Sequence, residues 1–313
     1  MRQNAQNIIH GRPNPESGLT ATVGTFDGVH TGHRYLLEEL KRQAAARDSR
    51  PVAIVIDPHP LQIVRPEDAP PLLSTFDERR RAIESEGVEV FRLEFNERTR
   101  SETSDEFIAK IHDEMGVKTL LVGYDNRFGC DRTNGIGHYR EAGRKVGLEV
   151  IEAVCLPGVS SSAVRKRLLC GDIEEGNRLL GYRYGFTGLV VGGARLGRRL
   201  GFPTANLNPI QPERLIPPAG VYATLVRTDE TGDFRPSMTN IGHRPTVAEE
   251  DAPLSIETHI FDYEGDLYGR PVQVRFVSRL RDEKRFASVD ELKAQLKADS
   301  ADALAAIQNG KTI

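Results

Sequence analysis

The sequence predicts two domains: a doubly wound α/β domain, then a mostly β domain, an antiparallel barrel or sandwich, with a closing helix. Strand-like and helix-like stretches alternate through the first half. After Gly181, β-rich segments separated by Gly and Pro replace them. The length of 313 residues also fits about two domains. We place the boundary near residues 182–184, which gives domains 1–183 and 184–313.

The first half contains the signals of a parallel sheet. Motifs of the type Ser74-x-x-Asp77 and Thr103-x-x-Glu106 predict capped helix starts. Strands joined by helices imply parallel pairing. Strands are predicted at 21–24, 52–56, 88–95, 118–122 and 148–154, and helices at 35–40, 74–84, 103–115, 139–146, 162–169 and 173–180.

The second half has the alternation of antiparallel strands. Strands are predicted at 186–191, 221–226, 255–260 and 272–276. Ser288-x-x-Glu291 then begins a closing helix, in which Val289, Leu292 and Leu296 share one face.

Composition excludes several classes of protein. No apolar run reaches the roughly 18 to 20 residues that span a bilayer, and the N-terminus lacks the apolar core of a secretion signal. Cys130, Cys155 and Cys170 suggest neither a disulfide framework nor a zinc site. A net charge of -3 offers no general attraction for nucleic acid. We therefore expect a cytoplasmic protein with no membrane or nucleic-acid partner.

The first candidate site follows the strand that ends at Gly24. The segment from Thr25 to His33 leaves the strand through glycines and enters a helix, where free amides attract anions. His30 and His33 are three residues apart and share a helix face, so both imidazoles can donate to one phosphoryl group. The plain alternative is a glycine turn with a histidine that only caps the helix.

The second candidate site lies between residues 188 and 206, with one residue from a later strand. Its glycines let backbone amides surround phosphates, and Arg195, Arg198 and Arg199 add positive charge. Thr204 and Asn206 point to one face, which suits Mg²⁺, and Glu257 can act as a general base. Taken singly, these features also fit a solvated surface and a turn. Neither a P-loop string nor G-x-G-x-x-G occurs, which excludes the usual P-loop mechanism and weakens a dehydrogenase reading.

These motifs resemble the bacterial bifunctional riboflavin kinase/FAD synthetase family. The first half matches its adenylyltransferase in Thr25-Phe-Asp-Gly-Val-His-Thr-Gly-His33, Asp57-Pro-His-Pro60, Val122-Gly-Tyr-Asp-Asn-Arg-Phe-Gly129 and Ser160-Ser-Ser-Ala-Val-Arg165. The second half matches its riboflavin kinase module in Gly201-Phe-Pro-Thr-Ala-Asn206, Gly220-Val-Tyr222, Asn240-Ile-Gly-His-Arg-Pro-Thr246, Glu257-Thr-His-Ile-Phe-Asp262 and Leu267-Tyr-Gly269. The family fold implied is a Rossmann-like nucleotidyltransferase domain, then a six-stranded antiparallel barrel with a C-terminal helix.

The resemblance also assigns roles to residues. It implies catalytic roles for His30, His33, Arg165 and Glu257, and flavin contacts at Pro58, His59 and Asn126. Thr204 and Asn206 would bind the Mg²⁺ that accompanies ATP. The implied nucleotide contacts are Gly24, Phe26, Asp27, Gly28, Asp125, Arg127, Ser161, Ser162, Gly193, Arg198, Gly201, Thr204 and Asn206.

The activity implied is flavin cofactor synthesis, in which ATP phosphorylates riboflavin to FMN and a second ATP adenylylates FMN to FAD. One alternative is a riboflavin kinase whose first half only binds flavin or nucleotide, because Asn126 and Ser162 depart from the common family pattern. Two further alternatives are an RNA-binding protein with a nucleotidyltransferase-like fold, and a cytidylyl- or pantetheine-phosphate adenylyltransferase. The last leaves the motif at Pro203–Asn206 unexplained.

Overall fold

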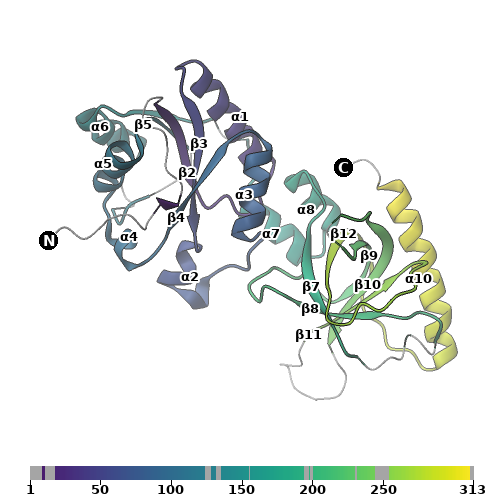
Figure 1. Ribbon diagram of the computed structural model, residues 1–313. Coiled ribbons are helices and arrows are strands. Elements are labelled where there is room, and N and C mark those ends of the chain that lie inside the picture. Colours follow the sequence, from purple (N-terminus) through teal and green to yellow (C-terminus); the bar gives the residue numbers. More distant parts are fainter. Residues whose placement is uncertain are drawn as a thin grey trace. The chain divides into compact units, whose positions relative to one another are not determined.

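A computed structural model describes residues 9–10, 18–123, 128–131, 135–154, 156–193, 197, 200–229, 231–243 and 254–310 (Figure 1). In the first half the elements are β1 (Ile9–His10), β2 (Leu19–Gly24), α1 (Thr31–Ala45), β3 (Arg50–Asp57), α2 (Pro60–Val64), the 3-10 turn η1 (Pro66–Asp68), α3 (Phe76–Ser85), β4 (Glu89–Glu94), α4 (Glu97–Ser101), α5 (Ser104–Met115), β5 (Val117–Val122), α6 (Ile136–Val146) and β6 (Glu149–Glu152). They are followed by α7 (Ser161–Leu169), α8 (Ile173–Leu180), β7 (Gly185–Val191), β8 (Ala205–Pro209), β9 (Gly220–Arg227), β10 (Arg235–His243), β11 (Leu254–Ile260), β12 (Pro271–Arg281) and α10 (Val289–Asn309).

The first half forms the predicted parallel sheet. Its strand order is β1-β4-β3-β2-β5-β6, in which β2 to β6 run parallel and β1 pairs antiparallel with β4. The chain adds strands on one side of β2 and then returns to add β5 on the other side. Ligands of such sheets bind beyond the carboxyl ends of the strands at this point of reversal. The exit of β2, which leads to His30, is therefore placed for ligand binding.

Helices cover both faces of this sheet. Leu37 and Leu40 of α1 pack with Ile83 of α3 on one face. Ile111 of α5 packs with Tyr139 of α6 on the other. Figure 1 shows α1 and α3 on one side of the strands and α5 and α6 on the opposite side. Burial on both faces explains the apolar run Val52–Ile56 in β3, whereas β4 alternates apolar with charged residues.

The capping motifs show where sequence patterns decide helix starts. Thr103 caps α5 and exchanges hydrogen bonds with Glu106, as expected. Helix α3 begins one residue later than expected, because Thr75 and Glu78 form its capping box. The Ser74 hydroxyl is instead used in the turn after β2, where it accepts a hydrogen bond from Gly28.

The second half closes into a six-stranded antiparallel barrel of order β10-β11-β8-β7-β12-β9. Periodicity alone did not predict β8 or β10. Strand β10 was missed because its buried positions include Ser237 and Thr239, whose hydroxyls bond the Thr224 hydroxyl at 2.9 and 2.8 Å. A hydroxyl can replace an apolar group inside a barrel when it is fully hydrogen-bonded, and this removes the hydrophobic alternation.

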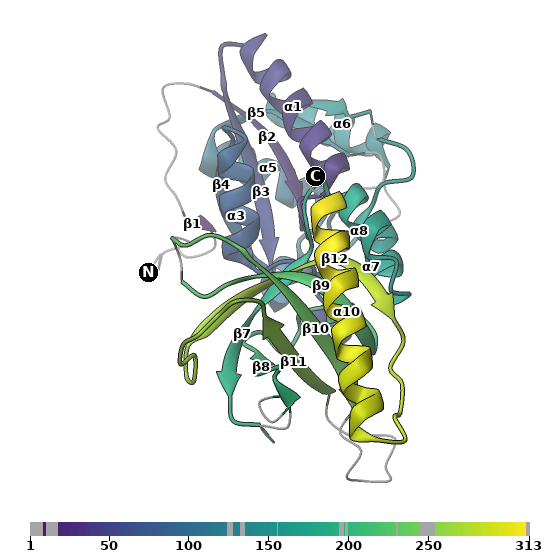
Figure 2. The same cartoon turned by 90° about the vertical axis from the view of Figure 1, so that its right-hand side faces the viewer.

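Helix α10 packs along the outer face of the barrel. Ala303 and Ile307 of the helix contact Ala223 and Met238 of the barrel. Figure 2 shows α10 running beside β9, β10 and β12. Ser288 caps the helix start as expected. Within the described residues, no helix is long and apolar enough to cross a membrane.

The chain divides into two compact units, Met1–Val159 and Ser160–Ile313. Helices α7 and α8, which the sequence assigned to the first domain, thus belong to the second unit. The Asn177 side chain of α8 provides a physical reason. Its Nδ2 donates to the carbonyl of Phe276 in β12 at 3.0 Å, and its Oδ1 accepts from the amide of Tyr184 at 2.7 Å.

We predict that Asn177→Ala destabilises the second unit by about 2 to 4 kcal/mol, because it leaves two buried backbone groups unpaired. Chemical denaturation of the purified protein measures this. Asn208→Ala, at an exposed position of the same barrel, is the matched control and should change the unfolding free energy by less than about 0.5 kcal/mol. Equal effects of the two substitutions would contradict the role given to Asn177.

Candidate functional site

The turn after β2 has an unusual backbone. Phe26, Gly28 and Val29 have φ values of 51°, 81° and 36°. Only the glycine adopts such angles readily, and a β-branched residue there is strained. Phe26 and Val29 are both buried in the core, which holds the turn in this conformation. Strain kept in place by surrounding packing is typical of functional sites.

His30 and His33 lie side by side at the start of α1. His30 is the N-cap, and its Nδ1 accepts a hydrogen bond from the backbone amide of His33 at 3.2 Å. Neutral His30 therefore carries its proton on Nε2. The two rings stack with centroids 3.7 Å apart. The plain reading of a capping histidine is thus correct for His30, and the same geometry brings both imidazoles to one helix N-terminus.

His33 is held in its neutral form. Burial is the main cause that keeps the pKa of the His33 imidazole well below its usual value, and electrostatic interaction with the His30 imidazole and the Arg79 guanidinium lowers it further. Its Nδ1 is buried and has no hydrogen-bond partner within the described residues. A buried polar atom without a partner is costly, so an added ligand or water that bonds it stabilises the site. The imidazole can donate to an anion without first carrying a charge.

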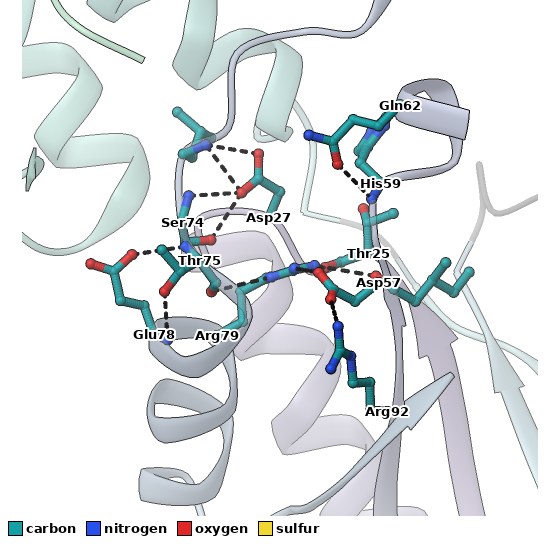
Figure 3. Close-up of polar contacts among 12 residues, drawn as sticks. Thr25, Asp27, Asp57, His59, Gln62, Ser74, Thr75, Glu78, Arg79 and Arg92 are labelled. Carbon is teal, nitrogen blue, oxygen red and sulfur yellow. Dashed lines mark hydrogen bonds and ion pairs between the residues drawn. The ribbon is translucent and has the colours of Figure 1, made fainter. Parts of the chain in front are cut away.

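Asp27 supports the turn. Its carboxylate accepts hydrogen bonds from the amides of Leu73 and Ser74 at 2.9 Å and from the Ser74 hydroxyl at 2.9 Å (Figure 3). The side chain is 1% exposed. These bonds tie the segment before α3 to the turn after β2. Asp27 therefore holds neighbouring groups in position, and its contact with the nucleotide stays a prediction.

An arginine that the sequence analysis did not identify joins two strand ends. Arg79 of α3 donates to the carbonyl of Thr25 at 2.6 Å and to the carboxylate of Asp57 at 2.5 Å. Arg92 of β4 bonds the other oxygen of Asp57 at 2.5 Å (Figure 3). Arg79 is 3% exposed, so this ion pair is buried. Arg79 is 22 residues from Asp57, and no local sequence pattern links residues at that separation. The sequence analysis therefore identified the motif at Asp57 but not its arginine partner.

Pro58 and His59 lie between β3 and α2, next to a cavity. His59 caps α2 through its Nδ1, which accepts from the amide of Leu61 at 3.2 Å. The cavity has a volume of about 380 Å³ and includes Ile56 and Pro60 on either side of this pair. Its other lining residues are mostly apolar or aromatic and come from β2, β4, α2, α5 and the segments after β4 and β5, among them Val23, Val64, Leu93, Phe95, Phe107 and Phe128.

The other residues of the first half that were expected to contact the nucleotide lie in three places. Ser160 caps α7, so Ser161 and Ser162 open its first turn. Arg165, one turn later, is 8% exposed. All three belong to the second compact unit. Gly24 ends β2 beside the histidine turn. Asp125, Asn126 and Arg127 lie outside the described residues, as does Arg198 of the second site.

In the barrel, Glu257 lies at the centre of the second site. The Thr204 hydroxyl donates to its carboxylate at 3.1 Å. On the neighbouring strands, Asn206 of β8 and Asn240 of β10 stand directly opposite Glu257 in register. Their side chains therefore share one face with it. The structure thus brings Glu257 next to Thr204 and Asn206, which precede it by 53 and 51 positions in the sequence.

The expected glycines allow a close approach. A Cβ at Gly193 would lie 2.1 Å from the amide nitrogen of Asn206, so only glycine fits against that buried side chain. Gly201 has φ of 84°, and it starts the turn that leads to Thr204. Asn206 is 8% exposed, which fixes its amide in one place.

Two cavities meet at Thr204. The first has a volume of about 360 Å³, lies between the barrel and α10, and is lined by Glu257 and by apolar side chains such as Phe202, Met238 and Leu296. The second, of about 390 Å³, is lined by Val190, Thr258, Ile260 and the segment 263–268. Thr204 lines both. Because successive strand residues face opposite sides, Glu257 and Thr258 belong to different cavities.

The low pKa of His33 predicts how stability depends on pH. The unfolded chain takes up a proton near pH 6.5, whereas folded His33 resists it until the pH is lower. This contribution to stability is fully present above about pH 6.5 and is lost as the pH falls below it, by up to about 1.4 kcal/mol per pH unit. Denaturant unfolding from pH 7.5 to 5 should show a flatter dependence for His33→Gln. Parallel curves for the two proteins would contradict this.

Comparisons with known proteins give matches to both halves of the chain. A family model described as FAD synthetase matches residues 13–163, and one described as riboflavin kinase matches residues 180–307. A bifunctional riboflavin kinase/FMN adenylyltransferase of Pseudomonas fluorescens is 40% identical, over 95% of this chain and 96% of its own. Proteins of the same name from Escherichia coli K12 and Bacillus subtilis are 38% and 31% identical, over 91% and 92% of each chain.

A solved structure shares the fold. A crystal structure described as a macrolide-efflux protein from Streptococcus pneumoniae has a TM-score of 0.80 and 29% sequence identity, and the match covers 92% of this chain and 94% of the other. The two family models together match both halves of the chain, and the curated relatives named above share one description that joins the two activities. The chain therefore belongs to the bifunctional riboflavin kinase/FMN adenylyltransferase family.

Proposed function

We propose that this protein makes flavin cofactors in two steps, at two separate sites. The barrel transfers the terminal phosphate of ATP to riboflavin and gives FMN. The α/β unit then transfers AMP from a second ATP to FMN and gives FAD and pyrophosphate. The observation that carries the proposal is Thr204, which lines two cavities and donates to Glu257 where they meet. A phosphoryl transfer needs this arrangement, with donor and acceptor approaching one point from two sides.

In the kinase step, riboflavin occupies the cavity beneath α10. Apolar and aromatic side chains such as Phe202 and Phe286 line one part of it and suit a flat ring system, and Glu257 is among the polar side chains that line the rest. The Glu257 carboxylate accepts the proton of the ribityl 5'-hydroxyl as its oxygen attacks the terminal phosphorus, and ADP leaves. The Thr204 hydroxyl orients the carboxylate through their 3.1 Å hydrogen bond. ATP then occupies the cavity lined by Val190 and Thr258.

The residues around Thr204 fit Mg²⁺ bound together with ATP. The Thr204 hydroxyl and the Asn206 amide offer neutral oxygens, and the absence of a side chain at Gly193 lets the Asn206 side chain lie directly against the backbone there. Within the described residues there is no cluster of three His, Cys, Asp or Glu that could hold a metal. Mg²⁺ bound by few protein ligands commonly completes its shell with water and substrate phosphates. When bound, it shields phosphate charge.

In the adenylyl transfer step, the FMN phosphate attacks the α-phosphorus of ATP and pyrophosphate leaves. His30 and His33 are placed to donate to the phosphoryl oxygens, where negative charge develops. The cavity beside Ile56 and Pro60 supplies an apolar site for the flavin ring at the same edge of the sheet. Ser161, Ser162 and Arg165 are assigned to the ATP phosphates by resemblance, with Arg165 as the charged partner.

The two family models favour this two-step function over a kinase with a binding module. The FAD synthetase model covers the histidine turn, and both imidazoles keep a geometry that can serve a phosphoryl group. The Ser162 position retains the hydroxyl that its common family counterpart, Thr, would supply.

We predict that the two activities separate by substitution. The double variant His30→Ala with His33→Ala should lose at least about a hundredfold in FAD formation from FMN while forming FMN at the wild-type rate. Glu257→Ala should form FAD from added FMN but lose FMN formation. Chromatography of flavins after incubation with ATP and Mg²⁺ measures both. If either variant remained folded yet lost both activities, the assignment of two sites would be wrong.

A further inference from the structure

His259 follows Glu257 on the same face of β11 and bonds the backbone beside Thr204. Its ring nitrogen Nδ1 lies 2.7 Å from the carbonyl oxygen of Pro203. A carbonyl oxygen only accepts, so Nδ1 carries the proton and donates it. The structure thus shows a polar contact between His259 and the segment that carries Thr204.

This contact holds a segment that the sheet does not hold. The ladder between β8 and β11 ends at the pair Ala205–Thr258, so Pro203 and Thr204 lie beyond its last register pair. Beyond the last backbone pair of β8 and β11, two side chains of β11 bond this segment. Glu257 accepts from the Thr204 hydroxyl, and His259 donates to the Pro203 carbonyl. Each of the two residues before β8 is thus fastened by one bond.

The imidazole is itself fixed by its neighbours. Its ring meets Phe202 and Phe261 edge to face, with centroids 5.5 and 5.4 Å apart. These contacts restrict the ring, and aromatic pairs of this geometry are favourable. Because the ring is restricted by its neighbours, its N–H can hold the Pro203 carbonyl in a more precise position than a mobile side chain could.

We propose that His259 is a positioning residue of the kinase site. It fixes the Pro203–Thr204 turn so that the Thr204 hydroxyl reaches Glu257 where the two cavities meet. The inference rests on the proposed kinase function for its catalytic consequence, but the restraint on the turn does not depend on that function.

The test compares two substitutions of His259. His259→Phe keeps an aromatic ring and removes the donor. His259→Asn removes the ring and places an amide N–H close to where Nδ1 stands. Hydrogen exchange of the amides of residues 204–206 in the full-length protein should be faster in His259→Phe and close to wild type in His259→Asn. Equal exchange in wild type and His259→Phe would overturn the proposal, whatever the activities are.

Kinetics then show whether the restraint serves catalysis. His259→Phe should lower kcat for FMN formation by about tenfold or more, because misplacing a catalytic group slightly is costly, and His259→Asn should recover most of it. Adding His259→Phe to Thr204→Val should cause little further loss, because the histidine acts through that threonine. Additive losses would overturn the proposed route. A wild-type protein that forms no FMN would instead refute the kinase function, with the exchange result unaffected.

Discussion

The handling of phosphate charge is the constraint that shapes both halves of this protein. The chain carries a net charge of -3, so it has no general attraction for the polyanion ATP. Each half therefore presents polar donors at one local point. In the α/β unit these are the start of α1 and two imidazoles, one of which is held neutral by its surroundings. In the barrel the proposed counterparts are a glycine-containing segment and the oxygens of Thr204 and Asn206, which would hold the Mg²⁺ that accompanies ATP.

Neutral donors make binding depend on geometry, because hydrogen bonds weaken steeply with misalignment. Accordingly, several side chains outside the proposed phosphate contacts hold the site residues in place. Asp27 and Arg79 are buried charged residues whose bonds go to backbone groups and side chains around the first site. In the barrel, His259 and Glu257 hold the turn before β8. Supporting groups of this kind keep reactive groups in place before a ligand arrives.

Much of this could be predicted from sequence, because patterns are local. Short apolar runs such as Val52–Ile56 and Leu120–Val122 mark central strands of the sheet, and the motifs around His30, Thr204 and Glu257 are short. Strand β10 could not be predicted from periodicity, because bonded hydroxyls of Ser237 and Thr239 replace apolar groups inside the barrel.

Contacts between distant residues were equally hidden. Arg79, one partner of Asp57, lies 22 residues later in α3, and the carbonyl bound by His259 is 56 residues away. Helices α7 and α8 have helical patterns that do not reveal which unit they join. The bonds of Asn177 to Phe276 and Tyr184, which attach α8 to the barrel, appear only in three dimensions.

The central claim is that two independent sites act in sequence on one flavin, with FMN as the shared compound. A complementation assay tests it most directly: the His30→Ala, His33→Ala protein is mixed with the Glu257→Ala protein, and riboflavin, ATP and Mg²⁺ are added. The account predicts that neither protein alone makes FAD from riboflavin, and that the mixture does so after FMN accumulates. A mixture of folded proteins that makes FMN but no FAD, or no FMN at all, would contradict it.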